Sequence, residues 1–291
     1  GRYNYAKKND FDVLVVDEAH RLNEKSGLYS NLGENQIMEI IHTAKCSIFF
    51  LDENQRIALS DIGSRDEILH WARQAGAKIE EMELLSQFRC NGSDGYLAWL
   101  DHHLQIRETA NFDVSDLGYD FKVFDEAHKM HKEITKIDQK KQLARSVAGY
   151  CWDWKSKKNP DAHDIELGPL KMKWNLETHG SNWIIHPKSI TEVGCIHTCQ
   201  GLEIDYIGVI MGPDLVVRGG KVVTNGLARS RHDKTIKGFK TLLKQDKKLA
   251  EKRADEIIKN TYRTLMTRGM KGCYLHCTDP ETNEYFKSVV R

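Results

Sequence analysis

Short apolar runs alternate along this chain with stretches of helical periodicity, and this alternation is the strongest constraint on its fold. The apolar runs are Val13–Val16, Ser47–Leu51, Phe121–Phe124, Trp183–Ile185, Ile207–Met211 and Gly272–His276. Strands that alternate with helices predict a mainly parallel sheet covered by helices, an α/β architecture. The runs at Val13 and Ser47 lack polar alternation, which is typical of central strands buried on both faces.

The segments between these runs supply the predicted helices and turns. Apolar residues at helical spacing predict helices over Leu28–Thr43, Ser64–Ala75, Asp125–Ile137 and Gln139–Trp154. Residues 156–178 are rich in Lys, Asp, Pro and Gly with little periodicity, which predicts an exposed insertion. Gly219 and Gly220 stand between two β-branched runs, the pattern of a two-residue hairpin.

The overall composition limits the class of protein. A chain of 291 residues with 40% hydrophobic and 29% charged residues can bury one or two cores. Its formal net charge of +1 excludes a polybasic protein, so any nucleic-acid surface has to be local. No apolar run approaches the roughly 18 residues that cross a bilayer, and the first residues form no apolar signal core. We therefore expect a cytoplasmic protein without membrane association. Its seven cysteines, an odd number, favour reduced thiols over a disulfide framework.

Lys and Arg dominate residues 229–259, where apolar residues recur at helical spacing. The simpler interpretation is a solvated helix face, because charge runs usually face water. The alternative is a patch that contacts phosphates.

The segment from Phe11 to His20 carries the strongest chemical signal. An apolar strand ends there in two adjacent carboxylates, Asp17 and Glu18. In a nucleotide hydrolase the first can hold Mg²⁺ through its water shell, and the second can orient or deprotonate the attacking water. The alternative is a strand that ends in an acidic turn, since Asp and Glu also begin helices.

Two further polar side chains follow predicted strands. Gln55 comes after the apolar run that ends near Leu51, and the carboxyl edge of an open α/β sheet is where ligands bind. Gln55 can contact a terminal phosphate or its attacking water, or belong to an ordinary strand-to-helix turn. Arg89 follows Leu84 and offers a planar, permanently charged donor that suits a polyphosphate. A surface salt bridge is the alternative for Arg89.

Two downstream segments add candidate nucleotide contacts. Gln200 and Gly201 mark a tight turn, and Glu203 can accept hydrogen bonds from ribose hydroxyls. Residues 260–269 are predicted as a helix that leads toward the strand at Gly272. Arg268 at the end of this segment is a candidate arginine finger, which would stabilise charge developing on a transferred phosphoryl group.

The order of these motifs is more specific than any one of them. Asp17-Glu18, Gln55, Gln87-Phe-Arg89, Thr198-Cys-Gln-Gly-Leu-Glu203 and Thr267-Arg-Gly269 follow the order of superfamily-one helicase motifs. The chain most closely resembles the Schlafen-group-3-like DNA/RNA helicase domain family. The residues that carry this resemblance are Phe88–Asn91, Gln200–Tyr206, Gly212–Asp214 and Tyr262–Met270.

The resemblance implies two RecA-like P-loop NTPase lobes, with ATP and Mg²⁺ between them and single-stranded DNA or RNA as partner. Residues 1–90 would form the remainder of the first lobe, and residues 91–291 the second lobe with a helical insertion. The roles implied are Asp17 as the Mg²⁺ residue, Glu18 and Gln55 facing ATP, Arg89 and Arg268 at the γ-phosphate, Gln200, Gly201 and Glu203 at the nucleotide, and His197 and Thr198 near the nucleic-acid backbone.

One departure from the family pattern is large. The family has a GxxxxGKS/T loop before the Asp-Glu pair, whose amides and lysine hold the phosphates, and this sequence contains none. We therefore expect a fragment with an incomplete first lobe, preceded in its parent by this loop and by a possible effector domain. By itself the fragment is expected to hydrolyse ATP poorly.

Three other functions compete with this prediction. The first alternative is a zinc site formed by Cys195, His197 and Cys199 with Cys273, His276 and Cys277, although their spacing differs from that of zinc ribbons. The lobes could serve as a non-catalytic module that binds nucleic acid or protein, with the aromatic residues near Tyr96 and Trp152 as stacking platforms or as core. A nucleotide hydrolase that remodels proteins is the third alternative.

Overall fold

The computed structural model describes residues 3–25, 32–83, 90, 93–110, 118–140, 143–175, 182–199 and 203–290. The chain forms two compact units. Unit 1 contains residues 1–84 and 234–239, and unit 2 contains residues 85–233 and 240–291. Within the described residues, each helix is too short or too polar to traverse a lipid bilayer.

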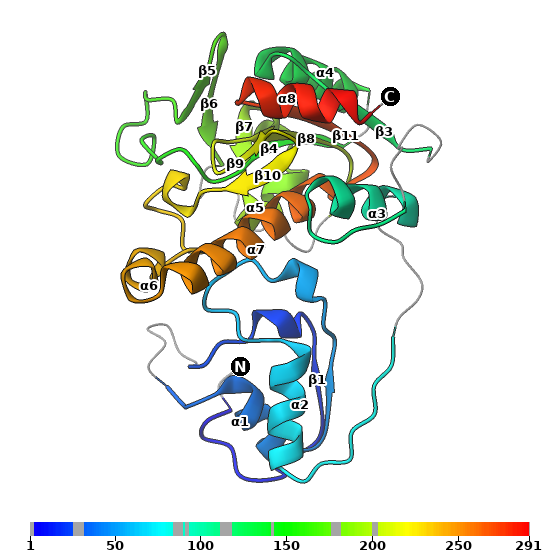
Figure 1. The fold of residues 1–291 in the computed structure, drawn as a ribbon, viewed down its shortest axis with the longest axis vertical. Coiled ribbons are helices and arrows are strands. Elements are labelled where there is room, and N and C mark those ends of the chain that lie inside the picture. Colours follow the sequence, from blue (N-terminus) through cyan, green and yellow to red (C-terminus); the bar gives the residue numbers. More distant parts are fainter. Residues whose placement is uncertain are drawn as a thin grey trace. The chain divides into compact units, whose positions relative to one another are not determined.

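Unit 1 contains a two-stranded parallel sheet, two α-helices and two 3-10 turns (Figure 1). Its elements are β1 (Phe11–Val16), η1 (Ala19–Arg21), α1 (Gln36–Thr43), β2 (Ala44–Phe49), η2 (Glu53–Gln55) and α2 (Arg65–Gln74). The side chain of Ser64 caps α2, close to the predicted start of that helix. The start predicted for the helix over Leu28–Thr43 is too early. Residues 32–35 are not helical, and Asn35 caps α1 by accepting from the amides of Ile37 and Met38.

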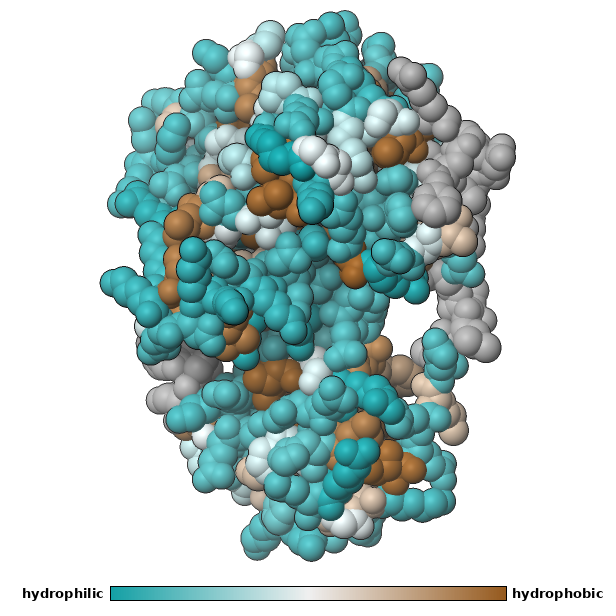
Figure 2. All heavy atoms as spheres, in the orientation of Figure 1, coloured by the Kyte–Doolittle hydropathy of each residue, from teal (hydrophilic) through white to brown (hydrophobic). Residues whose placement is uncertain are grey.

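The prediction that β1 and β2 are buried on both faces is wrong for the described residues. Val13, Val15 and Ile48 are exposed by 52%, 62% and 42%, and Phe11 and Phe50 share their face. Figure 2 shows hydrophobic surface where Figure 1 draws β1. The opposite face is partly buried, and Ser47 there donates to the carbonyl of Ile40 in α1. The sequence pattern of a central strand is present, but cover for one face is absent among the described residues.

This exposed face predicts self-association of the chain. Replacing Val15 and Ile48 together by lysine is expected to reduce association while leaving the melting temperature nearly unchanged, because both side chains already face water. Light scattering at increasing protein concentration measures the effect. Val223→Lys is the control, since Val223 is a similarly exposed valine on another sheet. Equal association of all three proteins would contradict the prediction.

Unit 2 is built on a seven-stranded sheet in the order β3-β11-β8-β4-β7-β6-β5, parallel except for the β5–β6 pair. This confirms the α/β class with a mainly parallel sheet. The strands are β3 (Asp120–Val123), β4 (Ala144–Ala148), β5 (Ile165–Leu167), β6 (Leu170–Trp174), β7 (Glu192–Gly194), β8 (Ile204–Met211) and β11 (Gly269–Cys277). A separate hairpin, β9 (Leu215–Arg218) and β10 (Lys221–Thr224), turns at Gly219 and Gly220, both with positive φ, as the sequence predicts.

Helices cover both faces of this sheet. The helices of unit 2 are α3 (Asp94–His103), α4 (Ala127–Gln139), α5 (Ile196–Cys199), α6 (Phe239–Gln245), α7 (Lys247–Met266) and α8 (Pro280–Ser288), with 3-10 turns η6 (Pro187–Thr191) and η7 (Gly226–Ala228). Gly208 in β8 lets α4 approach, because a Cβ there would lie 2.8 Å from the side chain of Ile134. Ile207 and Val209 alternate to the opposite face and are fully buried, and α7 also contacts β8.

Three predictions for unit 2 are wrong. Residues 139–154 were predicted as a helix, but they contain β4, whose five residues are all buried between β8 and β7. Residues 182–185 form a 3-10 turn instead of a strand. The expected exposed insertion at 156–178 contains β5 and β6, and Trp174 is only 1% exposed. For β4, β5 and β6, pairing and burial in the sheet outweigh local propensity.

Candidate functional site

The turn after β1 presents the two predicted carboxylates of unit 1. Asp17 is exposed, and its Oδ1 accepts from the amide of Glu18 at 2.9 Å. Glu18 has a φ of 52°, a left-handed conformation that is uncommon outside glycine and that costs free energy. Its Oε2 lies 3.1 Å from Nε2 of the buried His20. The amide of Ala19 donates to the carbonyl of Phe50 at 2.9 Å, which ties this turn to the end of β2.

Gln55 follows β2 at the same edge of the parallel sheet. It ends η2 and is 6% exposed. Its Nε2 donates to Oδ2 of Asp52 at 2.8 Å, and Asp52 also caps this turn through the amide of Asn54. Because the carboxyl ends of parallel strands meet at one edge, Asp17, Glu18 and Gln55 all belong to that edge of unit 1.

In unit 2, Glu203 and Arg268 lie side by side at the amino edge of the sheet. They directly precede Ile204 and Gly269, which are paired in the parallel β8–β11 ladder. The amide of Ile204 donates to the carbonyl of Arg268 at 3.0 Å. Arg268 is 3% exposed, and its Nε donates to the carbonyl of Thr264 in the last turn of α7. Glu203 is exposed.

The short helix α5 carries His197 and Thr198. The hydroxyl of Thr198 accepts from the amide of Cys195 at 3.0 Å and donates to its carbonyl at 2.9 Å, which holds the first turn. The His197 side chain is 42% exposed, and its Nε2 lies 4.0 Å from Asp233. Burial raises the pKa of the Cys199 thiol to about 12, although the nearby Arg268 charge opposes this shift. Helix α5 and Arg268 are therefore neighbours.

Three predicted site residues, Arg89, Gln200 and Gly201, lie outside the described residues. The residue after Arg89 is described. Cys90 is 1% exposed, and its thiol donates to the carbonyl of Thr267 at 3.7 Å. Cys90 therefore contacts the residue that precedes Arg268.

The sequence patterns did not predict a buried cluster of charged side chains that lies close to α5. Arg229 pairs with Asp214 at 3.2 Å and with Asp233, and all three side chains are fully buried. Tyr262 of α7 donates to Asp214, and its oxygen accepts from the amide of Gly212 at 2.9 Å. Burial alone would lower the pKa of Arg229, but the two carboxylates outweigh burial and raise it. Arg229 and Asp233 lie four residues apart in the loop after η7, whereas Asp214 follows β8, so only the fold reveals that the three residues form one cluster.

The Cys and His side chains considered as zinc ligands do not form a metal site among the described residues. Among the described residues, no three His, Cys, Asp or Glu side chains are placed to hold a metal ion. All seven cysteines are free, and burial raises the pKa of Cys195, Cys273 and Cys277, which keeps these thiols protonated. The exposed Asp17 still fits Mg²⁺, which commonly uses one or two carboxylates together with water and phosphate oxygens.

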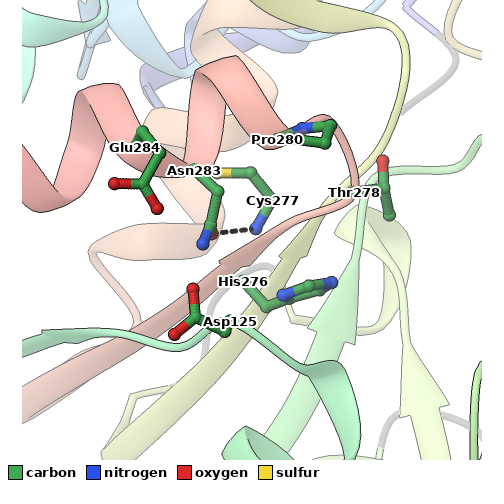
Figure 3. A pocket seen from close by; sticks show the side chains of 7 residues that line it. All are labelled: Asp125, His276, Cys277, Thr278, Pro280, Asn283 and Glu284. Carbon is green, nitrogen blue, oxygen red and sulfur yellow. Dashed lines mark hydrogen bonds between the residues drawn. The ribbon is translucent and has the colours of Figure 1, made fainter.

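A pocket at the opposite sheet edge does not include the predicted nucleotide residues. It has a volume of about 170 Å³ and lies where β3 and β11 end and α8 begins (Figure 3). Its lining residues are Asp125, His276, Cys277, Thr278, Pro280, Asn283 and Glu284. Burial lowers the pKa of His276, and its Nδ1 lies 3.0 Å from the carbonyl of Phe124. This volume is below the roughly 300 Å³ of common ligand pockets.

The fold and the motif positions define an α/β protein of the RecA-like class. The sequence profile of the Schlafen group 3, DNA/RNA helicase domain matches residues 2–279. The chain belongs to this family, as the sequence resemblance indicated. It is also similar to the uncharacterized protein YPL245W of Saccharomyces cerevisiae, with 25% identity over 295 residues. That alignment covers 94% of this chain and 64% of the yeast protein, so the chain spans less than two thirds of this relative. The family indicates a helicase-like function that involves nucleic acid.

Proposed function

We propose that this chain supplies most of the ATPase centre of a helicase or translocase that moves on single-stranded DNA or RNA. The pairing of Ile204 with Gly269 carries the proposal, because it brings Glu203 and Arg268 to one sheet edge from distant parts of the sequence. A residue whose carboxylate can accept from ribose hydroxyls is thereby adjacent in the sheet to a residue whose guanidinium suits phosphate.

Each predicted residue has a defined task in this mechanism. Asp17 would hold Mg²⁺ through water, and the ion would supply positive charge to the phosphates of ATP. Glu18 orients and deprotonates the attacking water, and His20, whose Nε2 lies 3.1 Å from Oε2 of Glu18, positions this carboxylate. The other assigned residues are Gln55 at the terminal phosphate, Arg89 and Arg268 at the phosphoryl charge, Gln200, Gly201 and Glu203 at the nucleotide, and His197 and Thr198 at the nucleic-acid backbone.

The proposal places the phosphate-binding loop in a longer polypeptide. In support, this sequence contains no GxxxxGKS/T motif, whose amides and lysine hold the phosphates in nucleotide hydrolases of this class. The apolar face of β1 and β2, which has no cover among the described residues, suits packing against further elements of the first lobe.

A non-catalytic module that binds nucleic acid or protein is the second candidate. Two of the assigned side chains favour it, because their polar groups already have partners within their own turns. Gln55 donates to Asp52, and the Thr198 hydroxyl bonds to the backbone of Cys195. Either side chain has to exchange a local partner to contact a ligand.

Glu18→Gln decides between the two candidates. In the longer protein that includes the phosphate-binding loop, this variant is expected to lose at least about a hundredfold in ATP turnover, because the amide cannot accept the proton of water. Its affinity for ATP and for oligonucleotides should stay close to that of the parent. Phosphate release and equilibrium binding are measured separately, with and without single-stranded DNA or RNA.

Glu24→Gln is the matched control, since Glu24 is an exposed glutamate outside the site. Turnover by Glu18→Gln at the parent rate would overturn the catalytic assignment. A parent protein that binds oligonucleotides but never releases phosphate would establish the binding module instead.

A further inference from the structure

A group of six basic side chains, here called the basic ridge, lies on α6 and the first turns of α7. Its members are Lys240, Lys244, Lys247, Lys248, Lys252 and Arg253, all of them exposed. Residues 240–253 contain only two acidic residues, Asp246 and Glu251, so this short segment carries +4 in a chain whose total is +1. Figure 2 shows hydrophilic surface where Figure 1 draws α6 and the start of α7. Residues 240–253 are therefore a locally basic segment of a nearly neutral chain.

Most of the ridge has no carboxylate partner. Lys247 lies 3.7 Å from Glu251. Asp246 is engaged as the cap of α7, where it accepts from the amide of Leu249 at 3.0 Å. Within the described part of the chain, no carboxylate lies within 4.0 Å of the other five cations, which are Lys240, Lys244, Lys248, Lys252 and Arg253. Their charge is available to a ligand.

The stability of α7 does not account for these positions. Lys247 and Lys248 occupy the first turn, where the helix dipole disfavours positive charge, and this turn has no acidic residue. Lys248 and Lys252 are four residues apart on one helix, a spacing at which like charges repel. The packing of α7 relies on other residues, among them the buried Ala250, Ala254, Ile257 and Ile258. The ridge therefore opposes helix formation slightly and contributes little to the core.

Helix α7 holds the ridge on a rigid support. The buried Asp101 of α3 pairs with Arg263, and Nζ of Lys259 donates to the carbonyl of Gln105 at 3.0 Å. Thr224 of β10 donates to Asp255 at 2.8 Å. The same helix of 20 residues ends directly before Thr267 and Arg268. A ligand on the ridge would thus bind one end of the helix whose other end leads to the candidate arginine finger.

We propose that the basic ridge binds the phosphodiester backbone of a single-stranded nucleic acid. This inference rests on the nucleic-acid binding of the proposed function and assigns it a surface. Five cations on α6 and α7, with no carboxylate within 4.0 Å among the described residues, match a repeating phosphate charge, which needs no side-chain pocket. A protein partner would need an apolar centre, and Leu249, 37% exposed, is the one large apolar side chain exposed in the ridge segment among the described residues. DNA and RNA share this backbone chemistry, and the test separates them.

The test compares two triple variants with equal loss of charge. The ridge variant is Lys248→Gln, Lys252→Gln and Arg253→Gln. The control is Lys132→Gln, Lys155→Gln and Lys158→Gln, three exposed lysines elsewhere on unit 2. Fluorescence anisotropy measures the binding of a labelled 20-nucleotide oligo-dT and a labelled 20-nucleotide oligo-U to the whole chain, without ATP, over a range of salt concentrations.

The ridge variant is expected to lose at least about tenfold in affinity at 0.1 M salt, and the control less than about twofold. The slope of log K against log salt should become shallower by about 2, because each phosphate contact with a single strand contributes about 0.7. The melting temperature of the ridge variant should equal or exceed that of the wild type, since like-charge repulsion is removed. A larger loss for one oligonucleotide identifies DNA or RNA as the preferred strand.

Three results would overturn the proposal in distinguishable ways. If the ridge variant binds as tightly as the control, the strand binds elsewhere and only the ridge assignment fails. If the wild-type chain binds neither oligonucleotide, the nucleic-acid part of the proposed function fails as well. If polyglutamate competes for the ridge better than either oligonucleotide, the surface is a site for acidic proteins. ATP turnover is not part of the measurement, so an inactive centre does not affect the result.

Discussion

Arg268→Ala is expected to lower the rate of ATP hydrolysis by about a thousandfold in the longer protein that includes the phosphate-binding loop. In the proposed function the guanidinium would neutralise charge that develops on the transferred phosphoryl group, an interaction that is strongest in the transition state. Affinity for ATP should therefore fall much less than turnover. Single-turnover phosphate release and equilibrium ATP binding, measured on the same variant, separate the two effects.

Controls for Arg268→Ala have to separate catalysis from folding, because this side chain is 3% exposed and hydrogen-bonds to Thr264. Arg268→Lys keeps the charge without the planar guanidinium, and little turnover should return. Lys271→Ala removes a half-exposed charge three residues away and should leave turnover unchanged. Turnover of Arg268→Ala within threefold of the parent, with an unchanged melting temperature, would exclude contact with the reacting phosphate.

Asp214→Ala is expected to lower the free energy of unfolding of unit 2 by about 3–5 kcal/mol, because it breaks a fully buried ion pair. The change removes the partner of the Arg229 Nη1 and the acceptor for the Tyr262 hydroxyl. Among the described residues, Nη2 of Arg229 has no hydrogen-bond partner, so loss of Asp214 leaves Asp233 as the remaining carboxylate that pairs with Arg229. Urea unfolding followed by the fluorescence of Trp99, Trp174 and Trp183, all buried in unit 2, measures the loss.

Asp214→Asn should recover part of this stability, because the amide oxygen still accepts from Tyr262. Glu133→Ala, which breaks an ion pair between two side chains about half exposed, should leave the unfolding curve nearly unchanged. If Asp214→Ala costs no more than Glu133→Ala, the buried cluster is not a stabilising feature of this fold.

Local patterns in the sequence were sufficient for the elements that depend on neighbouring residues. The Gly219-Gly220 hairpin, the helix capped by Ser64 and the apolar strand before Asp17 and Glu18 all occur where predicted. Tight turns and helix caps depend on residues only a few positions apart, so the local sequence is sufficient to predict them. Asp17 and Glu18 also have well-defined local positions, since they follow the end of β1 wherever that strand lies.

Other elements depend on contacts that a local pattern does not contain. Residues 144–148 have no strand signature, yet they form β4 because β8 and β7 bury them on both sides. Trp174 belongs to a segment rich in polar and turn-forming residues and is nevertheless part of the core. Propensity differences of about 1 kcal/mol per residue are smaller than the burial of a large side chain, so the sheet decides the outcome.

The sequence alone therefore determined the α/β class, the order of the helicase-like motifs and the family to which the chain belongs. Only the tertiary structure decided which distant residues become neighbours. The β8–β11 pairing placed Glu203 beside Arg268, and loop packing enclosed Arg229 between two carboxylates. A motif consists of residues close together along the chain. Strand order and buried ion pairs depend on contacts between distant segments, and a local sequence pattern does not contain the free energy of those contacts.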